Sequence, residues 1–70
     1  MIKCNFRVLM AQNKIDNLVI FKQLSGVSRN SINKLWHEQD ITSIKLETLI
    51  KICNALQCGL SDLIEYTPEP

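Results

Sequence analysis

The sequence predicts an all-α domain of five short helices, and three observations lead to this prediction. Apolar residues recur at spacings of three and four along most of the chain, as they do on one face of a helix. Gly26 and Ser28 stand between two such segments, where a glycine can end one helix and a serine can cap the next. Residues 46–56 carry the clearest amphipathic pattern, which predicts a helix lying on the core.

The composition fits one compact domain over residues 1–70. A chain of this length buries only about 60% of its extended surface, so the core must be small. Apolar residues make up 46% of the chain and charged residues 21%, which is typical of globular proteins. No apolar run approaches the roughly 20 residues that span a bilayer, and Lys3, Asn5 and Arg7 interrupt any secretory pattern. We therefore expect a cytoplasmic protein that is not attached to a membrane.

The first two helices are expected over residues 5–12 and 17–24. Asn13 and Lys14 end the first helix, and either Asp16 or Asn17 can cap the second. Gly26 closes the second helix because it tolerates a positive φ. The apolar residues expected to face the core or its flanks are Phe6, Leu9, Met10, Leu18, Val19, Ile20, Phe21 and Leu24.

The third helix is expected over residues 29–37, after a turn too short for anything but a sharp change of direction. Val27 supplies an apolar plug in that turn, and Ser28 caps the helix. Ile32 and Leu35 face inward together. Two helices packed across a glycine turn form a helix-turn-helix, although the same arrangement also occurs as plain core structure.

The outward face of this third helix is polar. Its exposed side chains can hydrogen-bond base edges or phosphates, and they are Arg29, Asn30, Asn33 and Lys34. Residues 1–34 carry six basic side chains and one acidic side chain, whereas residues 35–70 carry two basic and six acidic side chains. A basic half around a candidate recognition helix suits a surface that faces DNA, and ordinary solvated charge is the alternative.

The remaining chain is expected to form a polar loop over residues 37–43, a fourth helix and a short closing turn. The apolar positions of the fourth helix are Leu46, Leu49, Ile50, Cys53 and Leu56. Gly59 is expected just past its end and Ser61 at the cap of the closing turn, which carries Leu63 and Ile64 inward. Residues 1–4 and 65–67 alternate like strands, so a small terminal β-pairing is expected.

No catalytic, metal or cofactor site is expected. His37 is the only histidine, there is no glycine-rich phosphate loop, and the carboxylates are scattered, so the protein is not expected to be an enzyme. Cys4, Cys53 and Cys58 lack a paired C-x-x-C spacing, which favours small buried apolar residues over zinc ligands. No small-molecule ligand is evident either.

Three segments resemble helix-turn-helix transcriptional regulators of the Cro/phage-repressor type, also called the xenobiotic-response-element-like type. The resemblance is to the short single-domain members in particular. The segments are SGVSRNSINKLW (residues 25–36), IKLETLIKICNALQC (44–58) and LSDLIEYTPE (60–69), so the resemblance covers nearly the whole chain. It implies a repressor-like five-helix fold with a helix-turn-helix at about residues 17–37. It also implies sequence-specific binding of double-stranded DNA by a regulator, here a repressor.

The resemblance places Ser28, Arg29, Asn30, Asn33 and Lys34 at the major groove, with Ser31 as an alternative base reader. In chemical terms, arginine can contact guanine with two hydrogen bonds, and asparagine can contact adenine in the same way. Trp36 is expected to pack on the domain rather than to stack on DNA.

This chain departs from the family pattern at three places. Leu18 stands where family members often carry a glutamine that binds a phosphate, and Lys22 replaces a small residue. Glu38 and Asp40 make the loop after the third helix acidic, which would repel phosphates. These departures support an alternative function, a protein-interaction module of a phage or toxin–antitoxin system with weak or no DNA binding.

Two chains are expected to form a homodimer, because one short recognition helix reads few base pairs and a small domain gains stability from an added interface. The apolar residues expected at that interface are Leu60, Leu63, Ile64 and Tyr66.

Overall fold

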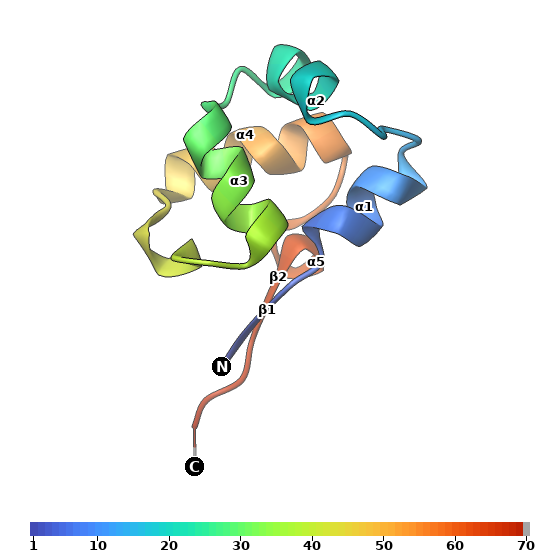
Figure 1. The fold of residues 1–70 in the computed structure, drawn as a ribbon. Coiled ribbons are helices and arrows are strands. Elements are labelled where there is room, and N and C mark those ends of the chain that lie inside the picture. Colours follow the sequence, from blue (N-terminus) through green and yellow to red (C-terminus); the bar gives the residue numbers. More distant parts are fainter. Residues whose placement is uncertain (70) are drawn as a thin grey trace.

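The computed structural model describes residues 1–69, and within them five α-helices surround one core while two short strands pair at the termini (Figure 1). This confirms the predicted five-helix class and the terminal β-pairing. The elements are β1 (Ile2–Cys4), α1 (Phe6–Gln12), α2 (Leu18–Ser25), α3 (Arg29–His37), the 3-10 turn η1 (Ile41–Ser43), α4 (Leu46–Leu56), α5 (Leu60–Leu63) and β2 (Ile64–Tyr66). No helix among these residues is long and apolar enough to cross a membrane.

The turn between α2 and α3 has the predicted caps. The Asn17 side chain accepts a hydrogen bond from the backbone N–H of Val19 at 2.7 Å, which fixes the start of α2. Gly26 ends α2 in the left-handed region with φ of 71°. Ser28 then accepts from the backbone N–H of Ser31 at 3.4 Å and begins α3. Hydrogen bonds and backbone conformations of neighbouring residues therefore fix where α2 begins and ends and where α3 begins.

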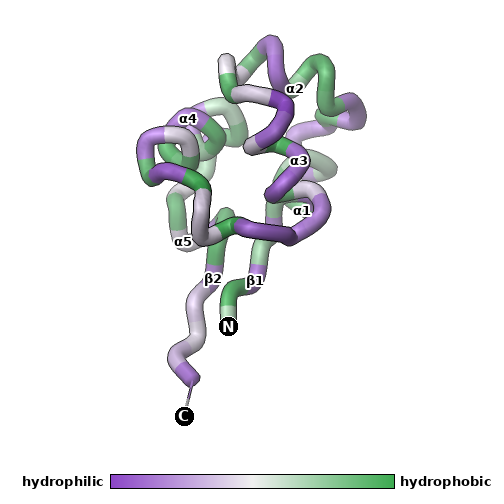
Figure 2. Tube along the Cα trace, turned by 60° about the vertical axis from the view of Figure 1, so that its left-hand side comes forward, coloured by the Kyte–Doolittle hydropathy of each residue, from purple (hydrophilic) through white to green (hydrophobic). Residues whose placement is uncertain are grey.

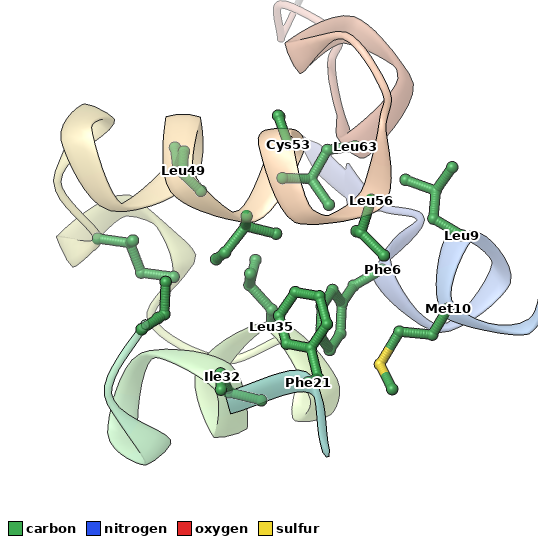
Figure 3. Close-up of a cluster of buried hydrophobic side chains, with 13 residues drawn as sticks. Phe6, Leu9, Met10, Phe21, Ile32, Leu35, Leu49, Cys53, Leu56 and Leu63 are labelled. Carbon is green, nitrogen blue, oxygen red and sulfur yellow. The ribbon is translucent and has the colours of Figure 1, made fainter. Parts of the chain in front are cut away.

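The core lies between α4 and the layer formed by α1, α2 and α3 (Figure 3). Phe6 of α1 meets Phe21 of α2 edge to face, with ring centroids 5.1 Å apart. Val27 is buried in the turn, as predicted for an apolar plug. The buried residues are Phe6, Leu9, Met10, Phe21, Val27, Ile32, Leu35, Ile44, Leu49, Ile52, Cys53, Leu56 and Leu63.

The predicted burial was wrong along one edge of α2 and one edge of α4. Leu24 is 62% exposed and Ile50 is 50% exposed, whereas Ile52, which the predicted stripe omitted, is fully buried. Each helix buries only a narrow stripe because the domain is small. Leu46 was also expected on the buried side and is exposed, and Val19 and Ile20, which were expected at the flanks of the stripe on α2, are exposed as well.

The end of α4 also differs from the prediction. Gln57, rather than Gly59, takes the left-handed conformation, with φ of 53°. The helix closes by a hydrogen bond from the Cys58 N–H to the Cys53 carbonyl at 3.1 Å, the pattern of a Schellman motif. Gly59 has φ of −83° and instead begins α5, where its N–H bonds the Asp62 carboxylate at 3.0 Å. Ser61 lies inside α5 and does not cap it.

The two terminal strands run antiparallel, with Ile2 opposite Tyr66, Lys3 opposite Glu65 and Cys4 opposite Ile64. At the inner end, the Asn5 N–H donates to the Leu63 carbonyl at 2.8 Å. Leu63 is fully buried, so it is not available for the dimer interface expected from the sequence. β1 ends just before α1 and β2 begins where α5 ends, and the ribbon leaves the helical body there (Figure 1).

Candidate nucleic-acid interface

The helix α3 is fixed to the domain by one apolar side. Ile32 and Leu35 are fully buried beneath it, and Phe21 lies beside them in the core (Figure 3). Because these anchors take one face of the helix, the polar residues at its start point away from the core. The helix is therefore anchored by its buried apolar side and exposes a polar side.

The structure leaves the first residues of α3 open to solvent. Arg29 and Asn30 are exposed, and Arg29 Nε donates to the Asn33 side-chain oxygen one turn later at 3.3 Å. A guanidinium has five N–H donors, so this bond leaves others for a base or phosphate. Two of the predicted contact residues are thus brought together on one face.

The two predicted serines meet at the start of the same helix. Ser28 is exposed and Ser31 half-buried, and the Ser28 hydroxyl donates to the Ser31 hydroxyl oxygen at 3.2 Å. The first turn of a helix also presents backbone N–H groups and the positive end of its dipole, which attract anions. This end of α3 therefore suits a phosphate or a base acceptor.

Lys34 is held by the segment that follows α3. Its ammonium donates to the Ser43 hydroxyl at 2.9 Å, and that hydroxyl donates to the Asp40 carbonyl at 2.7 Å. The side chain is half-buried. In this conformation Lys34 joins α3 to η1, and the bond to Ser43 uses one of the three donors of the ammonium.

Arg7 fixes the far end of α3, and sequence reasoning missed it. Its Nε donates to the Trp36 carbonyl at 2.9 Å, and its guanidinium lies 5.0 Å from the centroid of the Trp36 ring. Trp36 also meets Phe6 edge to face at 6.4 Å, which confirms that it packs on the domain. Arg7 and Trp36 lie 29 positions apart, so no local sequence pattern could reveal their contact.

Acidic side chains lie directly after α3. Glu38 and Asp40 are both exposed, and both take left-handed backbone conformations, with φ of 55° and 53°. Glu38 closes the helix. The end of α3 is therefore followed by two negative charges, whereas the start of the helix carries Arg29.

The cysteines pack as small residues. Cys53 is buried, and Cys4 and Cys58 are half-buried. Burial raises the pKa of Cys58 to about 11, and the adjacent Cys53 adds to this shift. Burial also raises the pKa of Cys4. Thiols with raised pKa values stay protonated at neutral pH, which makes them poor nucleophiles.

The comparisons with known proteins agree with this geometry. The family model of the Cro/C1-type HTH DNA-binding domain matches residues 5–69, a span that contains all five helices and β2 and leaves out β1. No curated protein matches the chain. The chain therefore belongs to the Cro/C1-type helix-turn-helix DNA-binding domains.

Proposed function

We propose that this protein is a transcriptional repressor that binds double-stranded DNA as a homodimer and reads sequence with α3. The observation that carries the proposal is the exposed pair Arg29 and Asn30 at the start of a helix anchored by fully buried Ile32 and Leu35. Both side chains can make two hydrogen bonds to a purine edge. Family membership supports DNA binding in general, and these residues supply the specificity.

Individual roles follow from the surroundings of each side chain. Arg29 would read guanine while Asn33 steadies its guanidinium, and Asn30 would read adenine. Ser28 and Ser31, at the start of the helix, would contact a phosphate or a base, whereas Lys34 would contact a phosphate with the donors that Ser43 leaves free. Each two-bond contact contributes about 1–3 kcal/mol of discrimination against a wrong base.

A selection from randomised duplexes at low salt tests this proposal. The expected result is an enriched palindrome, because a symmetric dimer reads two half-sites about one helical turn apart. Enrichment of no sequence above the starting pool would contradict sequence-specific binding. A gel-shift series on random DNA would then show whether any binding remains.

The acidic residues after α3 favour a second candidate function, a module that binds a protein partner. Exposed Glu38 and Asp40 would repel phosphates if they faced DNA, and half-buried Leu18 offers no phosphate donor. Neutralising both carboxylates, by Glu38→Gln with Asp40→Asn, separates the two functions. Tighter binding to random DNA would support the repressor, whereas no DNA binding by either form would favour the protein partner.

A further inference from the structure

A groove of about 580 Å³ lies between α1 and the segment that runs from the end of α4 into α5. Both views of the chain show that α1 begins and α5 ends at the base of the β1–β2 ribbon (Figures 1 and 2), where the Asn5 N–H donates to the Leu63 carbonyl. Within residues 1–69, the lining of the groove takes no side chain from α2 or α3. The groove is therefore separate from the surface proposed to meet DNA.

The Asn13 side chain joins the end of α1 to the end of α4 at one end of the groove. Its Nδ2 donates to the Leu9 carbonyl at 2.8 Å and to the Leu56 carbonyl at 3.1 Å, so both of its N–H groups are used. Gln57 also lines the groove, and its Nε2 donates to the Asn54 carbonyl at 2.7 Å. These bonds orient the two amides and leave their oxygens available as acceptors.

The Asn5 side chain makes a similar connection at the other end of α1. Its Nδ2 donates to the main-chain carbonyl of Asp62 at 3.1 Å and to a carboxylate oxygen of Glu65 at 3.3 Å. One carboxylate oxygen of Asp62 accepts from the Gly59 N–H at 3.0 Å. The Asn5 oxygen and the second carboxylate oxygen of Asp62 therefore remain available as acceptors.

The groove combines negative charge with an apolar wall. Among the described residues that line it, Asp62 is the only charged one. Its charge reaches the thiol of Cys58 in the same groove, because burial raises the pKa of Cys58 and the Asp62 carboxylate adds to that shift. The wall consists of Val8, which is 56% exposed, and the buried residues Leu9 and Leu56.

The acceptors lie at two separate ends of the groove. Asn5 and Asn13 flank α1 and are eight positions apart, which corresponds to about 12 Å along a helix. An extended peptide covers this distance with about four residues. A single guanidinium or ammonium group is too small to reach both ends.

We propose that the groove binds an extended segment of a protein partner and receives an arginine of that segment at its Asp62 end. A guanidinium has five N–H donors and no acceptor, so it suits a site whose oriented groups are acceptors. It would bond the Asp62 carboxylate and the Asn5 oxygen, while its methylene stem covers Val8. Main-chain N–H groups of the same segment would meet the oxygens of Asn13 and Gln57.

The groove suits other classes of ligand less well. Phosphates carry the same sign of charge as Asp62, which disfavours nucleic acid. A free small molecule would stay largely in water, because Val8, Asn13 and Asp62 are exposed whereas small-molecule sites normally bury most of their ligand. A protein segment gains further contacts outside the groove, so it is the occupant that this site favours.

An NMR titration of the folded protein tests the groove. The probe is a capped pentapeptide with one arginine between alanines, and the matched control peptide carries neutral citrulline in place of the arginine. We expect the side-chain amide signals of Asn5 and Asn13 to shift saturably, with a Kd of about 1 mM for so short a peptide. The citrulline peptide should bind roughly tenfold more weakly, because hydrogen bonds to a charged donor are stronger.

Two pairs of variants locate the binding site. Asp62→Asn removes the charge of the groove, and Asp16→Asn removes an exposed carboxylate outside it. Val8→Lys adds a positive charge at the wall of the groove, and Val19→Lys makes the same change at an exposed valine of α2. We expect Asp62→Asn and Val8→Lys to raise the peptide Kd roughly fivefold or more, and the controls to change it less than about twofold. Circular dichroism checks that each variant is folded.

Three results would overturn this site. They are constant amide signals up to about ten times the expected Kd, equal affinities for the arginine and citrulline peptides, and an unchanged Kd in folded Val8→Lys. N-acetylarginine amide, as a free small molecule, should bind more weakly than the pentapeptide, and equal affinities would contradict an extended segment. None of these measurements contains DNA, so their outcome is separate from that of DNA binding by α3.

Discussion

Arg7 of α1 makes two contacts with the end of α3, in addition to the buried core between the helices. Arg7 bonds the Trp36 carbonyl at the end of the helix and lies over the indole ring, while Phe6 supports the ring from the core. A planar guanidinium can make both contacts at once, and the ammonium of lysine cannot. Arg7 is therefore a positioning residue for the recognition helix.

We predict that Arg7→Met lowers the free energy of unfolding by about 1 kcal/mol, the size expected for an exposed cation–π contact with one hydrogen bond. Arg7→Lys should fall between Arg7→Met and the wild type. Because Trp36 is the only tryptophan, its fluorescence reports both unfolding in urea and the local surroundings of the ring. Unchanged stability with unchanged emission in Arg7→Met would show that the contact is absent in solution.

Stability should also depend on pH through Cys58. Its pKa is about 11 in the folded chain against an ordinary value of 9.0, so the unfolded chain loses the proton first as the pH rises. The stabilising contribution is therefore complete below pH 9 and is lost between about pH 9 and 11. The readout is the difference in pH dependence between wild type and Cys58→Ser, because the variant lacks the thiol. Parallel unfolding curves across this range would contradict the raised pKa.

For the helices and turns, the sequence predicted the features that depend on neighbouring residues and missed those that depend on tertiary packing. Local chemistry predicted the turn between α2 and α3, because Gly26 and Ser28 carry their own conformational preferences. Helical spacing predicted α4 but not its buried side, since apolar residues surround much of that helix and only packing selects Ile52 over Ile50. On α3, Arg29 and Asn30 are exposed as predicted, whereas Asn33 and Lys34 are half-buried, and nothing in the sequence showed that Ser43 would hold Lys34.

Neighbouring isoleucines on α4 give a direct test of this packing. Ile52→Ala should cost about 2–5 kcal/mol because the side chain is fully buried, whereas Ile50→Ala should cost much less. In a domain this small the first change could unfold the protein at room temperature. Urea denaturation of both variants is the measurement. Equal losses from the two substitutions would mean that the buried stripe of α4 is misplaced.

At the scale of the whole molecule, the two ends of α3 meet different surroundings. Its start carries exposed Arg29 and Asn30, while its end contacts Arg7 and Cys4 of β1 and is followed by the acidic residues Glu38 and Asp40. The sequence showed the uneven charge but not this arrangement, which depends on the two termini meeting beside α3. We therefore infer that bases are read at the start of α3.

The central claim is that α3 reads bases through its first residues, and Arg29→Ala tests it most directly. Affinities of wild type, Arg29→Ala and the control Lys51→Ala, which removes an exposed lysine of α4, are measured on the selected site and on random DNA. We expect Arg29→Ala to lose about 1–3 kcal/mol of binding free energy on the selected site and to relax the preference at one base pair. Equal losses on both duplexes, or no greater loss than Lys51→Ala, would contradict it.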